Sequence, residues 1–207
     1  MKKSILRTLS VLLLFSALGI NNANAQVVKE GTIIFDVYYG FPNLYTSILK
    51  AEYVNEDLGS VYQNVDIGGI GPLGLRVEYL FTDKIGLGLD MNYTNSSVSW
   101  NETNSGETYD YKASVPRLRV MGKFNFHFTK SDNFDAYAAF GAGYGSFKLV
   151  AETNDPNYIF SEISNPVPVS IRFAVGARYF FNDNIGLNLE FGVLGGALIN
   201  GGISFKL

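Results

Sequence analysis

The sequence predicts an all-β protein, an eight-stranded antiparallel up-and-down transmembrane β-barrel. Apolar and polar residues alternate with period two in segment after segment, as in strands whose two faces meet different surroundings. The connections between these segments are alternately short and mostly long, which is typical of a barrel that crosses a membrane. After residue 25, no apolar run approaches the ~20 residues that a membrane-spanning helix needs.

Each predicted strand carries apolar residues on alternate positions. The first strand, near 31–40, has a weak pattern, and the next two present Leu75, Val77, Tyr79 and Phe81, then Ile85, Leu87, Leu89, Met91 and Tyr93. The fourth presents Leu118, Val120, Phe124, Phe126 and Phe128, and the fifth, near 134–147, is again weak. The last three present Val169, Ile171, Phe173, Val175, Ala177, Tyr179 and Phe181, then Ile185, Leu187, Leu189, Phe191 and Val193, and finally Ile199, Ile203, Phe205 and Leu207.

The connections differ at the two ends of the predicted barrel. Those at one end are very short and span 82–84, 129–133 and 182–184. Those at the other end are mostly longer and span about 41–67, 99–112 and 148–166, with only a few residues around Gly195 and Gly196. In outer-membrane barrels the short turns face the periplasm, so we expect both termini on that side.

Residues 1–25 have the form of a secretory signal peptide. Lys2, Lys3 and Arg7 precede an apolar run over 9–20, and Ala23-Asn24-Ala25 has the small-x-small form that a signal peptidase accepts. The apolar run is too short for a membrane anchor, since a spanning helix needs ~20 residues. The mature chain is therefore expected to begin at Gln26 and to form a single barrel domain over 26–207.

The composition of the chain excludes several classes of function. The whole chain has a net charge of -3, and residues 26–207 carry 13 basic and 19 acidic residues, a net of -6, which argues against nucleic acid as a partner. With 47% apolar and 17% charged residues, the chain is not disordered. It has no cysteine, which excludes disulfides, thiolate metal sites and cysteine nucleophiles.

The polar face of the strands is assigned to the barrel lumen. Arg76 and Arg172 lie on this face, and an arginine facing lipid near the membrane midplane costs about 2–4 kcal/mol. Because buried charges must be paired, we expect a cross-linked polar plug. The predicted lumen network consists of Arg76, Glu78, Asp90, Arg119, Lys123, Arg172, Arg178 and Glu190.

Pairing arithmetic predicts one contact in this network. If Phe81 lies opposite Ile85 across the first short turn, the residue numbers of strand partners sum to 166. Arg76 then lies opposite Asp90 on the lumen face, where oppositely charged neighbours attract. We therefore expect an ion pair between Arg76 and Asp90.

Counting strand partners from the other two short turns shows whether polar residues could form a catalytic site. It places Arg178 diagonal to Glu190, and it places His127, the only histidine, opposite Asp135 with Ser131 nearby in the turn. These three residue types form nucleophile triads in hydrolases, but no oxyanion hole is evident around Ser131. The sequence therefore predicts no catalytic, metal-binding or cofactor-binding residue.

A short segment occurs twice. Residues 79–89 and 179–189 match at seven of eleven positions, and both copies span a strand end, a short turn and the next strand start. The repeated unit is a hairpin, so we interpret it as shared turn chemistry within one barrel.

With these features the chain resembles the small eight-stranded outer-membrane β-barrel family, which has OmpX-like, OmpW-like and OmpA-barrel members. The most specific part of the resemblance is the C-terminus, where Asn200, Gly202, Phe205 and Leu207 fit the family's insertion signal, with leucine where an aromatic residue is commoner. The resemblance implies a location in the cell outer membrane and recognition of the last strand by the barrel-assembly machinery.

We expect a monomer in outer-membrane lipid, with a filled lumen and a structural or surface-interaction role, and not an enzyme. One alternative is an OmpW-like conduit for small hydrophobic molecules, because Ile34, Leu80 and Phe180 fall on the inward face and would give an apolar upper lumen. A second alternative is a soluble exported lipocalin-like binder. Tyrosines and Trp100 in the acidic outer loops either contact a partner or extend the barrel wall.

Overall fold

A computed structural model describes residues 26–42, 63–104, 106–159, 163–164 and 167–207. Eight strands close an antiparallel barrel in the order β1, β2, β3, β4, β5, β8, β9 and β10, and β10 pairs with β1. They are β1 (Ile33–Phe41), β2 (Gln63–Thr82), β3 (Ile85–Asn104), β4 (Glu107–His127), β5 (Phe134–Gly145), β8 (Val169–Phe180), β9 (Ile185–Val193) and β10 (Ile199–Lys206). The all-β, eight-stranded barrel predicted from the sequence is therefore confirmed.

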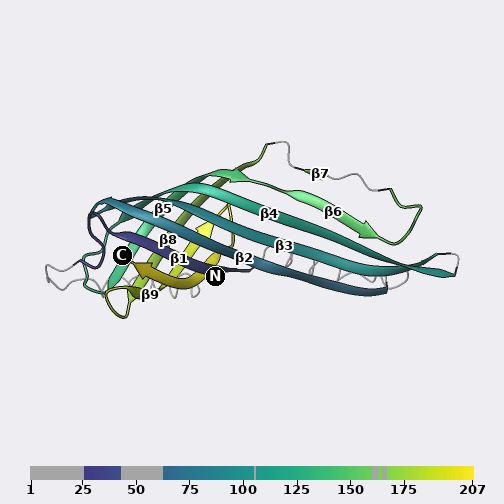
Figure 1. Ribbon diagram of the computed structural model, residues 1–207, viewed down its shortest axis with the longest axis horizontal. Coiled ribbons are helices and arrows are strands. Elements are labelled where there is room, and N and C mark those ends of the chain that lie inside the picture. The colour runs from purple at the N-terminus through teal and green to yellow at the C-terminus, as the bar shows by residue number, and fades with distance from the viewer. Residues whose placement is uncertain (1–25, 43–62, 105, 160–162, 165–166) are drawn as a thin grey trace, which may run out of the picture.

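Three of the strands are about twice as long as the others. β2, β3 and β4 have 20, 20 and 21 residues, whereas β9 and β10 have 9 and 8. Figure 1 shows these three strands running far beyond the rest of the barrel, with the C-terminus at the opposite end. The prediction of a loop over 99–112 is wrong, because β3 and β4 continue their pairing as far as Asn104 and Glu107.

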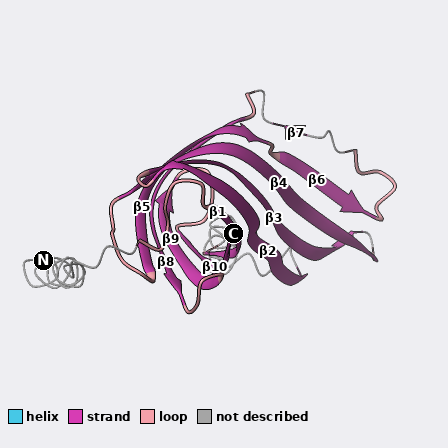
Figure 2. Ribbon diagram, turned by 60° about the vertical axis from the view of Figure 1, so that its left-hand side comes forward, coloured by secondary structure: helices cyan, strands magenta, loops and turns pink. Residues whose placement is uncertain are grey.

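Two further short strands lie outside the barrel ring. β6 (Lys148–Thr153) pairs with the far part of β4, and β7 (Ile163–Ser164) pairs with β6. The long loop expected over 148–166 thus contains strand structure. Of the loop expected over 41–67, residues 43–62 lie outside the described residues, and 63–67 belong to β2. Figure 2 shows β2, β3, β4 and β6 spreading away from the ring as one curved sheet. We call the part formed by 63–71, 95–104, 107–117 and β6 the extension.

Alternate residues of the barrel strands face inward and outward. In β9, Gly186, Asn188 and Glu190 are buried, whereas Leu187 and Leu189 are about half exposed, at 51% and 45%. The same arrangement is found around the whole ring. It is the reverse of an ordinary protein core, because ionised groups lie inside and aliphatic and aromatic groups lie outside. An apolar outer surface that runs around the whole ring is stable only when a nonaqueous phase covers it.

The apolar outer band ends partway along β3. Leu89, Met91 and Tyr93 point outward, and the next outward residue is Asn95, which begins a run of serine and asparagine. From this change to the end of β3, the extension continues for roughly 35 Å at ~3.3 Å per residue. The extension therefore leaves the hydrocarbon region and projects into water.

The turn end of the barrel is closed by an apolar cluster that includes residues before the first strand. Val27 and Val28 of the segment before β1 pack against Ile34, Leu80 and Phe180 in one buried apolar cluster, which we call the stopper. The hydrogen bond from Val27 N to Ser131 O holds this segment across the turns. The three inward apolar residues thus lie at the turn end, and the expectation that they form an apolar upper lumen is wrong.

The strand register follows the predicted arithmetic near the first short turn, and it departs from it at three irregularities in the pairing of β2 with β3 and at the middle turn. Most partners in β2 and β3 sum to 166, but a bulge near the turn places Thr82, not Phe81, opposite Ile85. Across the middle turn, His127 lies opposite Tyr137, and the prediction that it lies opposite Asp135 is wrong. Among the described residues, no helix is long and apolar enough to span a membrane.

Candidate functional site

The centre of the lumen is occupied by cations that converge on one carboxylate. Glu190 on β9 is fully buried and lies 3.0 Å from both Arg76 Nη2 and Arg172 Nε, and 2.7 Å from Lys123 Nζ. These cations come from β2, β8 and β4, so the contacts cross the lumen rather than follow one strand pair. Glu190 therefore links four of the eight barrel strands.

The predicted partner of Arg76 belongs to the same group. Arg76 Nε donates to Asp90 Oδ2 at 2.8 Å, the contact that the pairing arithmetic predicts. Asp90 also accepts a hydrogen bond from the Tyr38 hydroxyl at 2.5 Å, and the Arg76 guanidinium lies 4.0 Å from the centre of the Tyr38 ring. The negative charge of Asp90 is thus balanced by Arg76, and the contact is buried away from water.

A second group lies nearer the turns, around Arg178. Its guanidinium contacts Asp36 at 3.0 Å, Glu78 at 2.8 Å and Asp135 at 3.1 Å. The predicted diagonal register of Arg178 and Glu190 is present, with Glu190 opposite Gly176. The two side chains nevertheless bind different partners, because the long Arg178 side chain reaches carboxylates on other strands of the barrel.

His127 completes the second group. Its Nδ1 lies 2.8 Å from Asp135 and its Nε2 lies 2.8 Å from Glu78, so both ring nitrogens face carboxylates. Ser131 instead contacts Asn133 in the turn. The three residue types of a nucleophile triad are therefore present in sequence but not assembled in space.

All eight predicted network residues are buried, and the structure brings seven of them together. A 3.9 Å approach of Arg76 Nη1 to Asp36 Oδ2 joins the two groups into one network, which we call the lumen network. The eighth, Arg119, lies beyond it toward the extension and donates to Asn92 at 3.3 Å. The lumen network thus forms a barrier of paired charges across the middle of the barrel.

Sequence reasoning missed the polar residues that complete the network. Tyr38 and Tyr137 are buried and bonded to Asp90 and Glu190, and Ser204 donates to Asp36 at 2.6 Å. The inward register of these residues was available from the strand alternation. Their partners were not, because those contacts cross the lumen.

The insertion-signal residues have distinct places in β10 and at Leu207, which directly follows it. Asn200 points inward, and with its amide oxygen turned toward the cations it accepts from Arg76 Nη2 and Arg172 Nη2 at 2.9 Å each. This orientation places an acceptor, not a donor, beside two guanidiniums. Phe205 and Leu207 lie on the outside, 40% and 74% exposed, and Gly202 lies opposite Tyr38.

Two tyrosine rings in the lumen depend on glycines of the neighbouring strand. Tyr38 lies across Gly74, and Tyr137 lies across Gly176, where any Cβ would overlap the ring. β1 and β5 are four strands apart in the ring of eight, as are β2 and β8. The network is therefore built from two similar units on opposite sides of the lumen, and the repeated hairpins 79–89 and 179–189 belong to these units.

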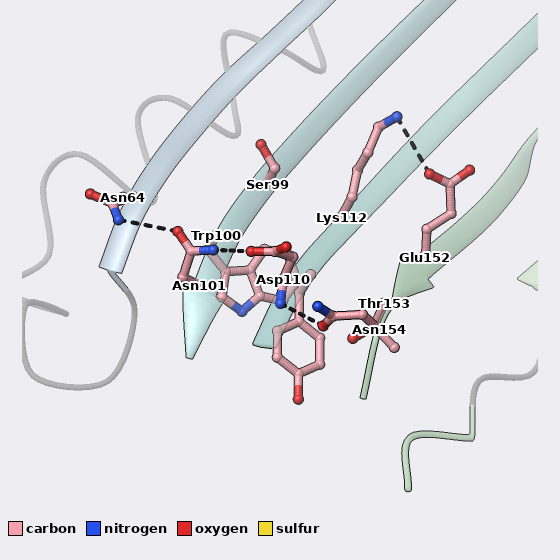
Figure 3. Close-up of a pocket in the computed structure, with 10 residues that line it drawn as sticks. Asn64, Ser99, Trp100, Asn101, Asp110, Lys112, Glu152, Thr153 and Asn154 are labelled. Carbon is pink, nitrogen blue, oxygen red and sulfur yellow. Dashed lines mark hydrogen bonds and ion pairs between the residues drawn. The ribbon is translucent and has the colours of Figure 1, made fainter. Parts of the chain in front are cut away.

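The outer face of the extension carries a row of polar side chains, shown in Figure 3. Asn64 donates to Asn101 at 3.2 Å, and Asn101 in turn bonds Asp110 on the next strand. Lys112 lies 3.5 Å from Glu152. This row borders a shallow cavity of about 500 Å³.

The inner face of the extension is aromatic. The Trp100 and Tyr111 rings stack at 5.6 Å, and Tyr158 meets Tyr111 edge-on at 5.5 Å. Tyr111 donates a hydrogen bond to Asp155 at 2.9 Å, and desolvation together with this bond raises the pKa of Tyr111 to about 12. A hydrogen bond to Glu107 likewise raises the pKa of Tyr109.

This combination of fold and site defines a transmembrane β-barrel of the outer membrane. The chain belongs to the outer membrane protein beta-barrel domain family, whose model matches residues 10–201. The protein is thus located in the cell outer membrane. Comparison with curated proteins finds no match.

Comparison with solved structures finds several that are similar to this chain. The N-terminal β-barrel domain of OprF from Pseudomonas aeruginosa is 10% identical, with 87% of this chain and 100% of that chain covered and a TM-score of 0.48. OprG from the same organism is 13% identical, with coverages of 90% and 99% and a TM-score of 0.46. Ail of Yersinia pestis is 12% identical, with coverages of 86% and 99% and a TM-score of 0.44.

Proposed function

We propose that this protein is a non-conducting outer-membrane barrel that displays the extension to the cell exterior, in a structural or surface-interaction role. The observation that supports this proposal is the lumen network, in which Glu190, Asp90 and their cations bridge opposite walls. Moving a solute past this level requires separating buried ion pairs, which costs several kcal/mol. The stopper adds a second, apolar barrier at the turn end.

Planar-bilayer recording of the purified full-length protein tests the closed lumen. We expect no steady single-channel openings and no flux of small polar or apolar solutes above that of the empty bilayer. A double variant, Arg76→Ala with Glu190→Ala, removes the central charges from opposite walls and should admit ions if it inserts. Steady openings of the unmodified protein contradict the proposal and favour a conduit.

The structural and surface-interaction roles separate in a strain that lacks the protein. The strain is complemented either with the full chain or with a chain whose residues 98–113 are replaced by an Asn-Gly turn between Ser97 and Ser114, which are strand partners. A structural role predicts that both chains restore resistance of the envelope to detergent. A surface role predicts that only the full chain restores adhesion between cells or to a surface. Failure of the full chain in both assays contradicts the proposal.

The biogenesis and surroundings of the protein form part of the same proposal. Residues 1–25, expected to be a signal peptide, lie outside the described residues, and intact mass measurement of the exported protein tests cleavage before Gln26. Recognition of β10 by the barrel-assembly machinery is tested by Phe205→Ser with Leu207→Ser, which should lower the amount of assembled barrel. We propose a monomer surrounded by outer-membrane lipid, which light scattering in detergent tests.

A further inference from the structure

Four polar residues form one continuous row across the outer face of the extension (Figure 3). Asn64 lies on β2, Asn101 on β3 and Asp110 on β4, and Asn154 directly follows β6. The Asn64 amide donates to Asn101 at 3.2 Å, Asn101 donates to Asp110, and the backbone N–H of Asp110 donates to Asn154 Oδ1 at 2.8 Å. Neighbouring strands lie ~4.8 Å apart, so the row is roughly 14 Å long. We call these four residues the amide row.

The amide row lines a cavity and retains hydrogen-bonding groups that point to no other residue. All four side chains line the cavity of about 500 Å³, and those of Asn64, Asp110 and Asn154 are exposed. Within the described part of the chain, Asn64 Oδ1, Asp110 Oδ2 and Asn154 Nδ2 make no hydrogen bond. Acceptors and donors thus stand side by side, which suits a polyhydroxylated ligand because each hydroxyl both donates and accepts.

The charge at the cavity favours an uncharged ligand. One lysine and two carboxylates line it, which gives a net charge of -1, and Lys112 lies 3.5 Å from Glu152. The remaining carboxylate, Asp110, makes no ion pair with a described residue. A phosphate or sulfate group is therefore repelled. Among the described residues, no group of three or more acidic or histidine side chains is placed to hold a metal ion.

The amide row is ordered without a ligand. Asn64 has a φ of +54°, a left-handed conformation that asparagine adopts more readily than most residues. It lies where the pairing of β2 with β3 shifts between Gln63 and Asp66, and its hydrogen bond to Asn101 fixes its side chain. A surface whose side chains are already fixed loses little conformational entropy when a ligand binds.

The amide row lies on the side of the sheet that faces the surrounding membrane. Tyr93 is the last apolar residue of the lipid-facing side of β3, and Asn101 lies eight residues further along the same face. This separation is about 26 Å along the strand. A lipid whose acyl chains contact the barrel reaches this level only if its headgroup is long. An oligosaccharide headgroup has both the necessary length and the hydroxyl groups.

We propose that the amide row binds the oligosaccharide headgroup of a glycolipid in the outer leaflet around the barrel. Asn64 and Asp110 accept hydrogen bonds from sugar hydroxyls, and the Asn154 amide donates to them. The length of the row suits a short oligosaccharide better than a single sugar. This inference rests on the proposed display of the extension at the cell exterior.

Titration calorimetry tests the site on the full-length protein in a nonionic detergent. The probe is the lipid-free oligosaccharide released from the outer-membrane glycolipid of the strain that makes the protein, and we expect saturable binding. Asp110→Asn keeps the acceptor for Asn101 but removes the charged oxygen, so binding should weaken about tenfold, as for loss of one charge-assisted hydrogen bond. Glu107→Gln is the matched control, because it removes the same charge from β4 outside the cavity, and it should leave binding unchanged.

A second set of variants leaves the charge unchanged. Asn64→Gly keeps the left-handed backbone accessible and removes one amide, and Asn154→Ala removes another. We expect each to weaken binding about threefold to tenfold, as for loss of a neutral hydrogen bond. Asn157→Ala removes an exposed amide that does not line the cavity and should have no effect. If Asp110→Asn fails to assemble, these variants decide the question.

Native mass spectrometry from nanodiscs tests the glycolipid itself. The nanodiscs contain equal amounts of the complete glycolipid and of the same glycolipid trimmed to its innermost sugars. We expect the unmodified protein to retain the complete form preferentially and Asp110→Asn to lose this preference. Equal retention of the two forms by the unmodified protein overturns the proposal, as does a lack of saturable oligosaccharide binding.

These measurements are independent of the closed lumen. A protein that conducts ions in planar bilayers but binds the oligosaccharide contradicts only the closed lumen. A protein that stays closed but does not bind the oligosaccharide contradicts only the glycolipid site.

Discussion

At the scale of single residues, the lumen reverses the usual rule that ionised side chains lie outside a protein. The charges of the lumen network are tolerated because opposite charges lie against them, as with Glu190 and its three cations. Such an arrangement is sensitive to loss of one partner, because the remaining charges stay buried and uncompensated.

The substitution Glu190→Gln tests this dependence. It leaves Arg76, Lys123 and Arg172 facing a neutral group, and we expect the free energy of unfolding to fall by about 3–5 kcal/mol. Urea denaturation in detergent micelles measures the change. Glu152→Gln is the control, since its partner Lys112 is half exposed and such surface pairs contribute about 0–1 kcal/mol. Equal effects of the two substitutions would contradict the assignment of Glu190 as the centre of the network.

Glycine gives a second residue-scale prediction. Gly176→Ala adds a Cβ that overlaps the Tyr137 ring, so the ring and its hydrogen bond to Glu190 must shift. We expect a loss of about 1–3 kcal/mol in unfolding free energy, as for other overpacked sites. Gly201→Ala is the matched control, because its nearest neighbours would lie at 3.8 Å and 3.9 Å, in ordinary contact. A Gly201 variant as unstable as the Gly176 variant would refute the steric explanation.

At the scale of elements, β2, β3 and β4 each serve two environments. The part of β3 up to Tyr93 has an apolar outer face for lipid, and the part from Asn95 onward has a polar one for water. The pairing of β3 with β4 continues without interruption through this change. The membrane boundary is therefore set by side chains and not by the end of a strand.

The extension also gives a pH-dependent prediction. The ordinary pKa of tyrosine is about 10, and desolvation and the bond to Asp155 raise that of Tyr111 to about 12. Because the folded pKa is the higher one, this interaction stabilises the extension below pH 10 and is lost as the pH rises toward 12. The ultraviolet absorbance of tyrosinate, taken as the difference between the unmodified protein and Tyr111→Phe, measures the transition. Asp155→Asn should move it to lower pH, and no movement would contradict the role of Asp155.

At the scale of the whole molecule, the barrel has barriers of different chemistry at different depths. The stopper is apolar and the lumen network is ionic, so a defect in one leaves the other in place. Val28→Asp places a carboxylate in the stopper, and the cost of burying it should lower the stability of the barrel by at least about 2 kcal/mol. We nevertheless expect planar-bilayer recordings of this variant to remain closed. Steady openings would show that the stopper alone closes the lumen.

Much of the fold follows from local sequence. The two-residue alternation, the short turns and the placement of arginines on one face predict the eight strands, the inward direction of Arg76 and Arg172, and the contact of Arg76 with Asp90. Strand partners across a tight turn are few residues apart, so counting from the turn finds them. Counting from the turn gives the wrong partner for His127, because the turn of 129–133 admits more than one register.

The sequence by itself determined which side chains face lipid and which face the lumen, since alternation along a strand fixes this before any strand finds its partner. Only the tertiary structure decided which lumen charges meet, how far β3 and β4 continue beyond the membrane, and that Val27 and Val28 close the turn end. The physical reason is that closing the ring brings side chains from opposite walls within 3 Å of each other. The number of residues between two such side chains in the sequence does not indicate that they will meet.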